Sequence, residues 1–234
     1  MAYRRLNPSW YDSRRVVLLG LQRALETVID AHFRQRSDLR LLDYGCADCC
    51  YRPLFAGIVA DYVGADLPGN PDAAIVLDAD GTIPAADGSF DIVLSTQVLE
   101  HVENVSVYLR ECRRVLKSEG HLILSTHGLW MYHPHPFDLW RWTGPGLERE
   151  LNRSGFDVIA QEGLLGLAPA ALQLLQDAIL QSRRVAWLPV LIRAPFWIAV
   201  QRLVRLFDVM YSPASRNLQA SVHLMVARPT KSNP

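Results

Sequence analysis

Apolar residues along the chain follow helical and strand spacings in turn, and this pattern predicts an α/β fold. Residues 10–36 keep helical spacing. Strands are expected at residues 39–43, 61–66, 74–78, 90–96, 121–126, 156–162 and 222–228, and further helices at 52–60, 105–116 and 146–154. Pro53 suits the first turn of the helix at 52–60, and Gly120 is expected to end the helix at 105–116. Strands alternating with helices favour a doubly wound, Rossmann-like parallel sheet.

The segment 163–217 is too long for a hairpin connection and carries two apolar helical stripes. The first comprises Leu167, Ala170, Ala171, Leu174, Leu175, Ala178 and Ile179, and the second Phe196, Val200, Leu203, Val204 and Phe207. The favoured interpretation is a helical cap over the site or a homodimer contact. A peripheral membrane contact through 183–207 stays open, because Arg183, Arg184 and Arg193 flank an apolar run. Residues 1–234 are thus expected to form one domain, with a helical segment at 1–38 and an insertion at 163–217.

Composition narrows the class of protein. The 234 residues suit one α/β domain, and the 24 basic and 24 acidic residues give no reason to expect a nucleic-acid partner. The apolar run at 185–192 is too short to span a bilayer, and no signal peptide is expected. Three of the four cysteines stand at 46, 49 and 50, without a second pair for a zinc site. They are expected to be reduced, buried thiols of a cytoplasmic protein.

The segment Leu41 to Asp48 is the most informative part of the chain. It reads Leu-Leu-Asp-Tyr-Gly-Cys-Ala-Asp, which places an acid, a glycine and a small residue after a buried strand. Asp66 closes the next strand-like run roughly 20 residues later, where nucleotide-binding folds offer a carboxylate to a ribose. Alone, Asp-x-Gly after a strand is often only a tight turn.

Further motifs follow this segment in order. They are Asp-Gly-Ser-Phe-Asp-Ile-Val at 87–93, Val-Leu-Glu-His-Val at 98–102 and Arg-Arg-Val-Leu-Lys-Ser-Glu-Gly-His-Leu at 113–122. With the segment at 42–47, this series resembles class I S-adenosylmethionine-dependent methyltransferases of the type 11 group, over residues 39–162 and the final strand. The resemblance implies a seven-stranded sheet whose last strand is antiparallel, with S-adenosylmethionine at the carboxyl ends of the first strands.

The resemblance also implies positions for cofactor contacts. Asp43 and Gly45 correspond to the family's contacts with the methionine part, and Asp66 to its ribose carboxylate. The remaining expected contacts are Ala47, Asp78, Ala79, Asp80, Ser95 and Gln97. Asp78 and Asp80 are alternatives for the adenine amino group. Ala47 departs from the family, which usually has glycine there, so a methyl group stands beside the expected ligand.

Histidines and aromatic residues gather after the later strands. His127 follows the strand at 121–126 and is the first candidate for a catalytic base; His101 is the second, with a structural role as its alternative. The expected contacts with the acceptor are Trp130, Tyr132, His133, Trp140 and Arg141. No metal site is expected, because no carboxylate stands at an obvious ligand spacing from these histidines.

The prediction is therefore an S-adenosylmethionine-dependent methyltransferase that acts on a hydroxyl of a small-molecule or saccharide-like acceptor. One alternative is a scaffold that binds the cofactor without turnover, which Ala47 would favour. The other is an NAD-dependent oxidoreductase, against which the incomplete glycine pattern argues.

Overall fold

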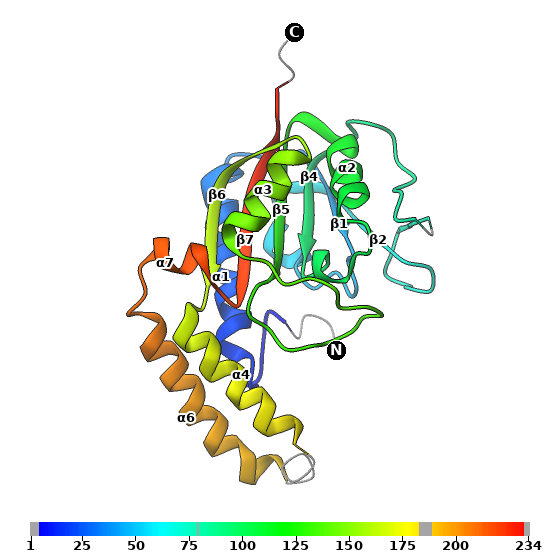
Figure 1. Cartoon of the computed structure of the whole chain (residues 1–234). Coiled ribbons are helices and arrows are strands. Elements are labelled where there is room, and N and C mark those ends of the chain that lie inside the picture. Colours follow the sequence, from blue (N-terminus) through cyan, green and yellow to red (C-terminus); the bar gives the residue numbers. More distant parts are fainter. Residues whose placement is uncertain (1–4, 79, 183–188, 232–234) are drawn as a thin grey trace.

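A computed structural model describes residues 5–78, 80–182 and 189–231 of the chain, and these form one central sheet covered by helices (Figure 1). The seven strands lie in the order β3-β2-β1-β4-β5-β7-β6. β7 pairs antiparallel with both β5 and β6, whereas the other neighbours pair in parallel. The strands are β1 (Leu39–Tyr44), β2 (Val59–Asp66), β3 (Ile75–Val76), β4 (Phe90–Thr96), β5 (Leu116–His127), β6 (Phe156–Leu164) and β7 (Val222–Pro229). The expected seven-stranded, Rossmann-like sheet with an antiparallel last strand is confirmed.

Both faces of the sheet are buried, as in other parallel sheets. Successive residues of β1 point to opposite faces, so Leu41 joins the core beneath α1 and Leu42 joins the core beneath α2 and α3. The helices flanking the sheet are α1 (Arg15–His32), α2 (Val105–Val115) and α3 (Gly144–Arg153), and two short 3-10 helices are η1 (Arg52–Phe55) and η2 (Leu99–His101).

Two sequence-based predictions of local structure are wrong. The helix expected at 52–60 is only the single turn η1, and β2 already begins at Val59. Gly57 lies between them with φ +82°, a conformation that does not continue a helix. Gly120 does not end α2 either. The C-cap of α2 is Leu116, which has extended backbone, and β5 begins at this residue, five residues earlier than expected.

The segment 163–217 completes β6 and then forms α4 (Leu167–Gln181), α6 (Val190–Asp208) and α7 (Pro213–Leu218). In Figure 1, α4 and α6 lie side by side and project beyond the end of the sheet. Arg183 and Arg184 lie outside the described residues. None of the helices in the described ranges combines the length and apolar character needed to cross a bilayer.

The expected burial of these two helices is largely reversed. Gln173, Gln176 and Gln201 are buried, and the Gln201 amide donates to Gln173 Oε1 at 2.8 Å. The amides of Gln173 and Gln176 also donate to the carbonyl of Ser13, which ties the hairpin to the segment before α1. Large apolar side chains face outward, namely Leu167, Leu175, Leu191, Ile192, Phe196, Leu203, Leu206 and Phe207. The packed side of the hairpin is mixed, because Ala170 of the first stripe and Val204 of the second are buried together with Trp197 and these glutamines.

Candidate active site

The loop after β1 requires a glycine. Gly45 has φ +78°, and a Cβ built there would lie 2.5 Å from Val98 Cγ2. The N–H groups of Gly45 and Cys46 donate to the carbonyl of Ala65 in β2, at 2.8 and 3.1 Å. The ends of β1, β2 and β4 therefore come together at one edge of the sheet, because Val98 follows β4.

Ala47 occupies the left-handed region, with φ +45°. Its N–H donates to Asp66 Oδ2 at 2.9 Å, and the amide of Asn70 donates to the same oxygen at 2.7 Å. Asp66 Oδ1 accepts from the N–H of Leu67 at 2.8 Å. The carboxylate of Asp66 thus has three donors from the chain, and about one of its four acceptor positions stays open. Asn70 was not anticipated, since nothing in its sequence context distinguishes it from an ordinary loop residue.

Asp43 is buried at the end of β1 and accepts a hydrogen bond from Tyr62 Oη at 2.6 Å. Burial raises the pKa of this carboxyl to about 7; the hydrogen bond from Tyr62 opposes the rise and the negative charge of Asp66 adds to it. The Asp43 side chain therefore packs with Tyr62 on the α1 side of the sheet.

The turn after β3 distinguishes the two candidate aspartates. Asp80 Oδ1 accepts from the N–H of Thr82 at 3.0 Å, so this carboxylate closes its own turn. The turn is held by Tyr44 Oη, which donates to the carbonyl of Gly81 at 2.6 Å. Asp78 is exposed, and its carboxylate has no hydrogen bond to the described residues. Ala79 lies outside the described residues.

Ser95 and Gln97 lie at the end of β4. The hydroxyl of Ser95 is buried 2.7 Å from Tyr108 Oη and points toward α2. Gln97 has φ +58°, and its N–H donates to the carbonyl of Ser125. Of these two residues, only Gln97 is partly exposed at the ligand edge.

The loop 128–142 covers the end of β5. The carbonyl of Glu100 in η2 accepts from the N–H groups of Leu139 and Trp140, at 2.8 and 3.2 Å. The indole N–H of Trp140 donates to the carbonyl of Val102 at 2.7 Å. The N–H of Trp142 donates to the carbonyl of His127 at 3.0 Å, which returns the loop to the strand it left.

Arg141 stabilises this loop from within. Its guanidinium donates to both oxygens of Asp138 at 2.6 Å, and also to the carbonyls of Met131 and Trp130. It therefore has little donor capacity left for a substrate in this arrangement. Tyr132, by contrast, is 71% exposed on the same loop.

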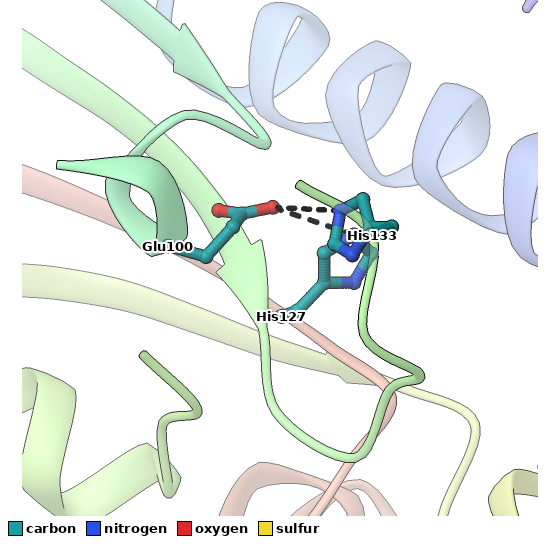
Figure 2. A group of neighbouring side chains, drawn as sticks. All are labelled: Glu100, His127 and His133. Carbon is teal, nitrogen blue, oxygen red and sulfur yellow. Dashed lines mark ion pairs between the residues drawn. The ribbon is translucent and has the colours of Figure 1, made fainter. Parts of the chain in front are cut away.

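Four residues form what we call the Glu100 cluster: Glu100, His101, His127 and His133. Glu100 Oε1 lies 3.3 Å from His127 Nε2, 3.9 Å from His101 Nε2 and 4.0 Å from His133 Nε2. Figure 2 shows Glu100, His127 and His133 pointing toward one another from three separate segments. Trp130 stacks on the ring of His127, with centroids 4.7 Å apart, and covers it.

Burial dominates the electrostatics of the cluster. It raises the pKa of Glu100 to about 7 and lowers the pKa of His127 well below its usual range; the neighbouring His133 and Arg141 lower that of His127 further. Three of these residues were singled out from the sequence. Glu100 was missed, although it stands beside His101 in the Val-Leu-Glu-His-Val motif.

Comparisons with known proteins agree with this geometry. Residues 42–124 match the family model described as "Methyltransferase domain". The match covers about a third of the chain, and this part of the chain is similar to methyltransferase domains. The chain is 38% identical to a ubiquinone biosynthesis O-methyltransferase of Cereibacter sphaeroides over 101 residues, which cover 38% of this chain and 41% of that protein. The match thus spans less than half the length of its relative.

Solved structures share the fold. A methyltransferase from Mesorhizobium loti has a TM-score of 0.54 at 18% identity, covering 86% of this chain and 96% of that one. The cyclase SpnF has a TM-score of 0.55 at 16% identity, covering 88% of this chain and 80% of that one. Because a protein named as a cyclase shares it, the fold alone does not determine the reaction.

The conformation of Ala47 generates a first prediction. An L-residue in the left-handed region is strained, and glycine is not. Ala47→Gly should therefore raise the free energy of unfolding by about 1 kcal/mol, measured by urea denaturation. Affinity for S-adenosylmethionine should be unchanged or higher, because the Cβ beside the expected ligand is removed. A folded variant that no longer binds the cofactor would contradict our interpretation of this loop.

The raised pKa of Asp43 generates a second prediction. The folded protein binds this proton more tightly than the unfolded chain, so its contribution to stability is present below about pH 4 and is lost as the pH rises through about 7. Asp43→Asn mimics the protonated carboxyl and still accepts from Tyr62. Relative to wild type, the variant should gain roughly 2–4 kcal/mol of stability between pH 4 and pH 8, measured by thermal unfolding without cofactor. A difference that does not change with pH would show that Asp43 keeps its ordinary pKa.

Proposed function

We propose that this protein transfers the methyl group of S-adenosylmethionine to a hydroxyl group of a small molecule held beneath the loop 128–142. The observation that carries the proposal is the meeting of two sets of residues at one edge of the sheet. The turn at Gly45 and the carboxylate of Asp66 form the cofactor side, and the Glu100 cluster forms the acceptor side.

The cofactor side fits the group that the family uses. We assign Asp66 to the ribose hydroxyls, which would bind at its open acceptor position and replace the amide of Asn70. We assign Asp78, rather than Asp80, to the adenine amino group, because the carboxylate of Asp80 is used in its own turn. The bound cofactor supplies a methyl group on a sulfonium sulfur, and the protein positions the acceptor in line with it and excludes water.

The acceptor side supports a hydroxyl substrate. Relatives that match this chain are named ubiquinone biosynthesis O-methyltransferases, and aromatic side chains of the loop 128–142 suit an aromatic acceptor. The hydroxyl proton needs an acceptor near the reacting oxygen, and we assign it to His127 within the Glu100 cluster. Arg141 is assigned to loop positioning, since its donors are engaged within the loop.

A second candidate is a scaffold that binds the cofactor without turnover. The strained Ala47 and the three donors already on Asp66 favour it, because both make the cofactor side less ready to accept a ligand. Cofactor binding without methyl transfer to any of a broad set of phenols, catechols and sugars would support the scaffold over the enzyme.

Asp66→Ala tests the cofactor assignment. Losing hydrogen bonds to a charged acceptor costs about 1–3 kcal/mol, so affinity for S-adenosylmethionine and its demethylated product should fall roughly 5- to 150-fold. Calorimetric titration measures this directly. Asp61→Ala is the matched control on the same strand, because Asp61 only forms an exposed ion pair with Arg40. Equal affinity of Asp66→Ala and wild type would refute the assignment.

His127→Ala tests the acceptor side. With catechol as the trial acceptor, formation of the demethylated cofactor should fall about a hundredfold or more, while cofactor affinity stays unchanged. His121→Ala is the control, since His121 lies in the middle of β5, where its ring contacts Phe33 instead of the Glu100 cluster. Loss of cofactor affinity in His127→Ala would instead place His127 on the cofactor side.

The outward apolar face of α4 and α6 supports a peripheral contact with an anionic lipid surface. Arg202 and Arg205 are exposed on α6 beside Leu203 and Leu206, which suits such a surface. Binding to phosphatidylglycerol vesicles should fall at least tenfold when Leu191 and Ile192 are both changed to Glu, and also at high salt. Val76→Glu, an exposed apolar position on β3, is the control. If wild type sediments as a dimer, the double variant sediments as a monomer and neither binds vesicles, the apolar face is a subunit contact instead.

A further inference from the structure

One carboxylate oxygen in the Glu100 cluster is fully buried without a hydrogen bond. Glu100 has no exposed surface, and its Oε2 accepts from Thr126 Oγ1 at 2.8 Å. Its Oε1 has no hydrogen-bond partner among the described residues. Leaving a buried acceptor of this kind unsatisfied is costly, and more so when it carries charge. The site therefore requires an occupant or a proton.

The groups facing this oxygen are imidazole nitrogens. Ligand atoms of Glu100, His127 and His133 all lie within 4.8 Å of one another. His101 adds a third Nε2, 3.9 Å from Glu100 Oε1. His101 belongs to η2, His127 to the end of β5 and His133 to the loop 128–142, so only the folded chain brings the three histidines together. Figure 2 shows His127 and His133 beside Glu100.

The outer nitrogens of two rings are already engaged. His101 Nδ1 lies 2.6 Å from the carbonyl of Phe137, and His133 Nδ1 lies 3.1 Å from the carbonyl of Met131. A carbonyl oxygen can only accept, so each Nδ1 carries the proton and each Nε2 presents a lone pair to the centre of the cluster. Histidine ligands of metals are held in the same way by carbonyls behind them.

We propose that Glu100, His127 and His133, with His101 next to them, bind a divalent first-row transition metal ion such as zinc. With the ion bound, His127 is a metal ligand and no longer the base. Two nitrogens and a carboxylate oxygen are a donor set that suits zinc and its neighbours. Ligands on a tetrahedral zinc stand roughly 3.3 Å apart, given bonds of about 2.0 Å. The separation of Glu100 Oε1 and His127 Nε2 matches this value, and the other two histidines lie 0.6–0.7 Å farther from the oxygen.

The charges around the cluster are consistent with a cation. Asp138 is neutralised by Arg141 at 2.6 Å, which leaves the charge of Glu100 without a basic partner in a hydrogen bond. A Glu100–His127 ion pair with a protonated imidazole is the alternative, but it would not explain why His101 and His133 also direct Nε2 at the same oxygen.

Metal binding can be tested without cofactor or acceptor. Tag-free protein treated with a chelator is titrated with zinc in a calorimeter, and cobalt absorption spectra provide a second readout. We expect one ion per chain, and at least tenfold weaker binding in Glu100→Gln and in His133→Ala. Thermal unfolding confirms that each variant is folded, and Glu100→Gln keeps the shape of the side chain if His133→Ala does not fold.

Control variants distinguish this site from other side chains of the chain whose type can bind zinc, namely His135 and the cysteines. His135→Ala removes a nearby histidine outside the cluster, and a Cys46→Ser, Cys49→Ser, Cys50→Ser variant removes the crowded thiols; both should bind zinc as wild type does. Zinc binding that is absent, that persists in Glu100→Gln, or that is lost with the cysteines overturns the proposal. Asp66→Ala should keep zinc affinity, so failure of the proposed cofactor assignment and failure of the metal site are distinguishable.

Discussion

The backbone carbonyl of Glu100 accepts two hydrogen bonds from the loop 128–142, and the arrangement of the Glu100 cluster depends on this contact. η2 follows β4, and the loop follows β5, so the two bonds join the ends of neighbouring parallel strands. They hold the loop over His127, which places His133 beside it and Trp130 on its ring. Arg141 and Asp138 then keep the loop compact. A single residue thus supplies both the docking carbonyl and the buried carboxylate of the cluster.

The sheet could be predicted from the sequence because strands buried on both faces are continuous apolar runs. β4 agrees with its expected bounds and lies between β1 and β5, and its side chains enter the cores on both faces of the sheet. The helix expected at 52–60 failed because Gly57 interrupts a segment too short to propagate a helix. Which side of the α4–α6 hairpin packs on the domain was not predictable, because periodicity reveals which residues share a face but not what each face contacts. Three buried glutamines satisfy one another and Ser13 there, which a hydrophobic pattern cannot reveal.

In the candidate site, the positions of several residues were predictable from the sequence, but their side-chain partners were not. Strand ends indicated where Gly45, Asp66 and His127 would gather, since parallel strands present their carboxyl ends at one edge. The partners of those residues were not predictable, because Tyr62 and Asn70 approach through side-chain contacts that no spacing encodes. Glu100 lies far from His127 and His133 in sequence, so a search for ligand spacing along the chain could not find the cluster.

Strain and unsatisfied charge concentrate at the ligand edge of the sheet. Ala47 and Gln97 have positive φ there, and the unpartnered oxygen of Glu100 belongs to η2, which follows β4 at the same edge. Such costs persist in a folded protein when the surrounding structure holds them, and they cluster where ligands bind. The shared fold of a methyltransferase and a cyclase shows that the sheet supplies only the edge. The reaction is determined by the side chains and ligands at that edge, and a ligand bonded to the unpartnered oxygen of Glu100 would offset part of the cost of burying it.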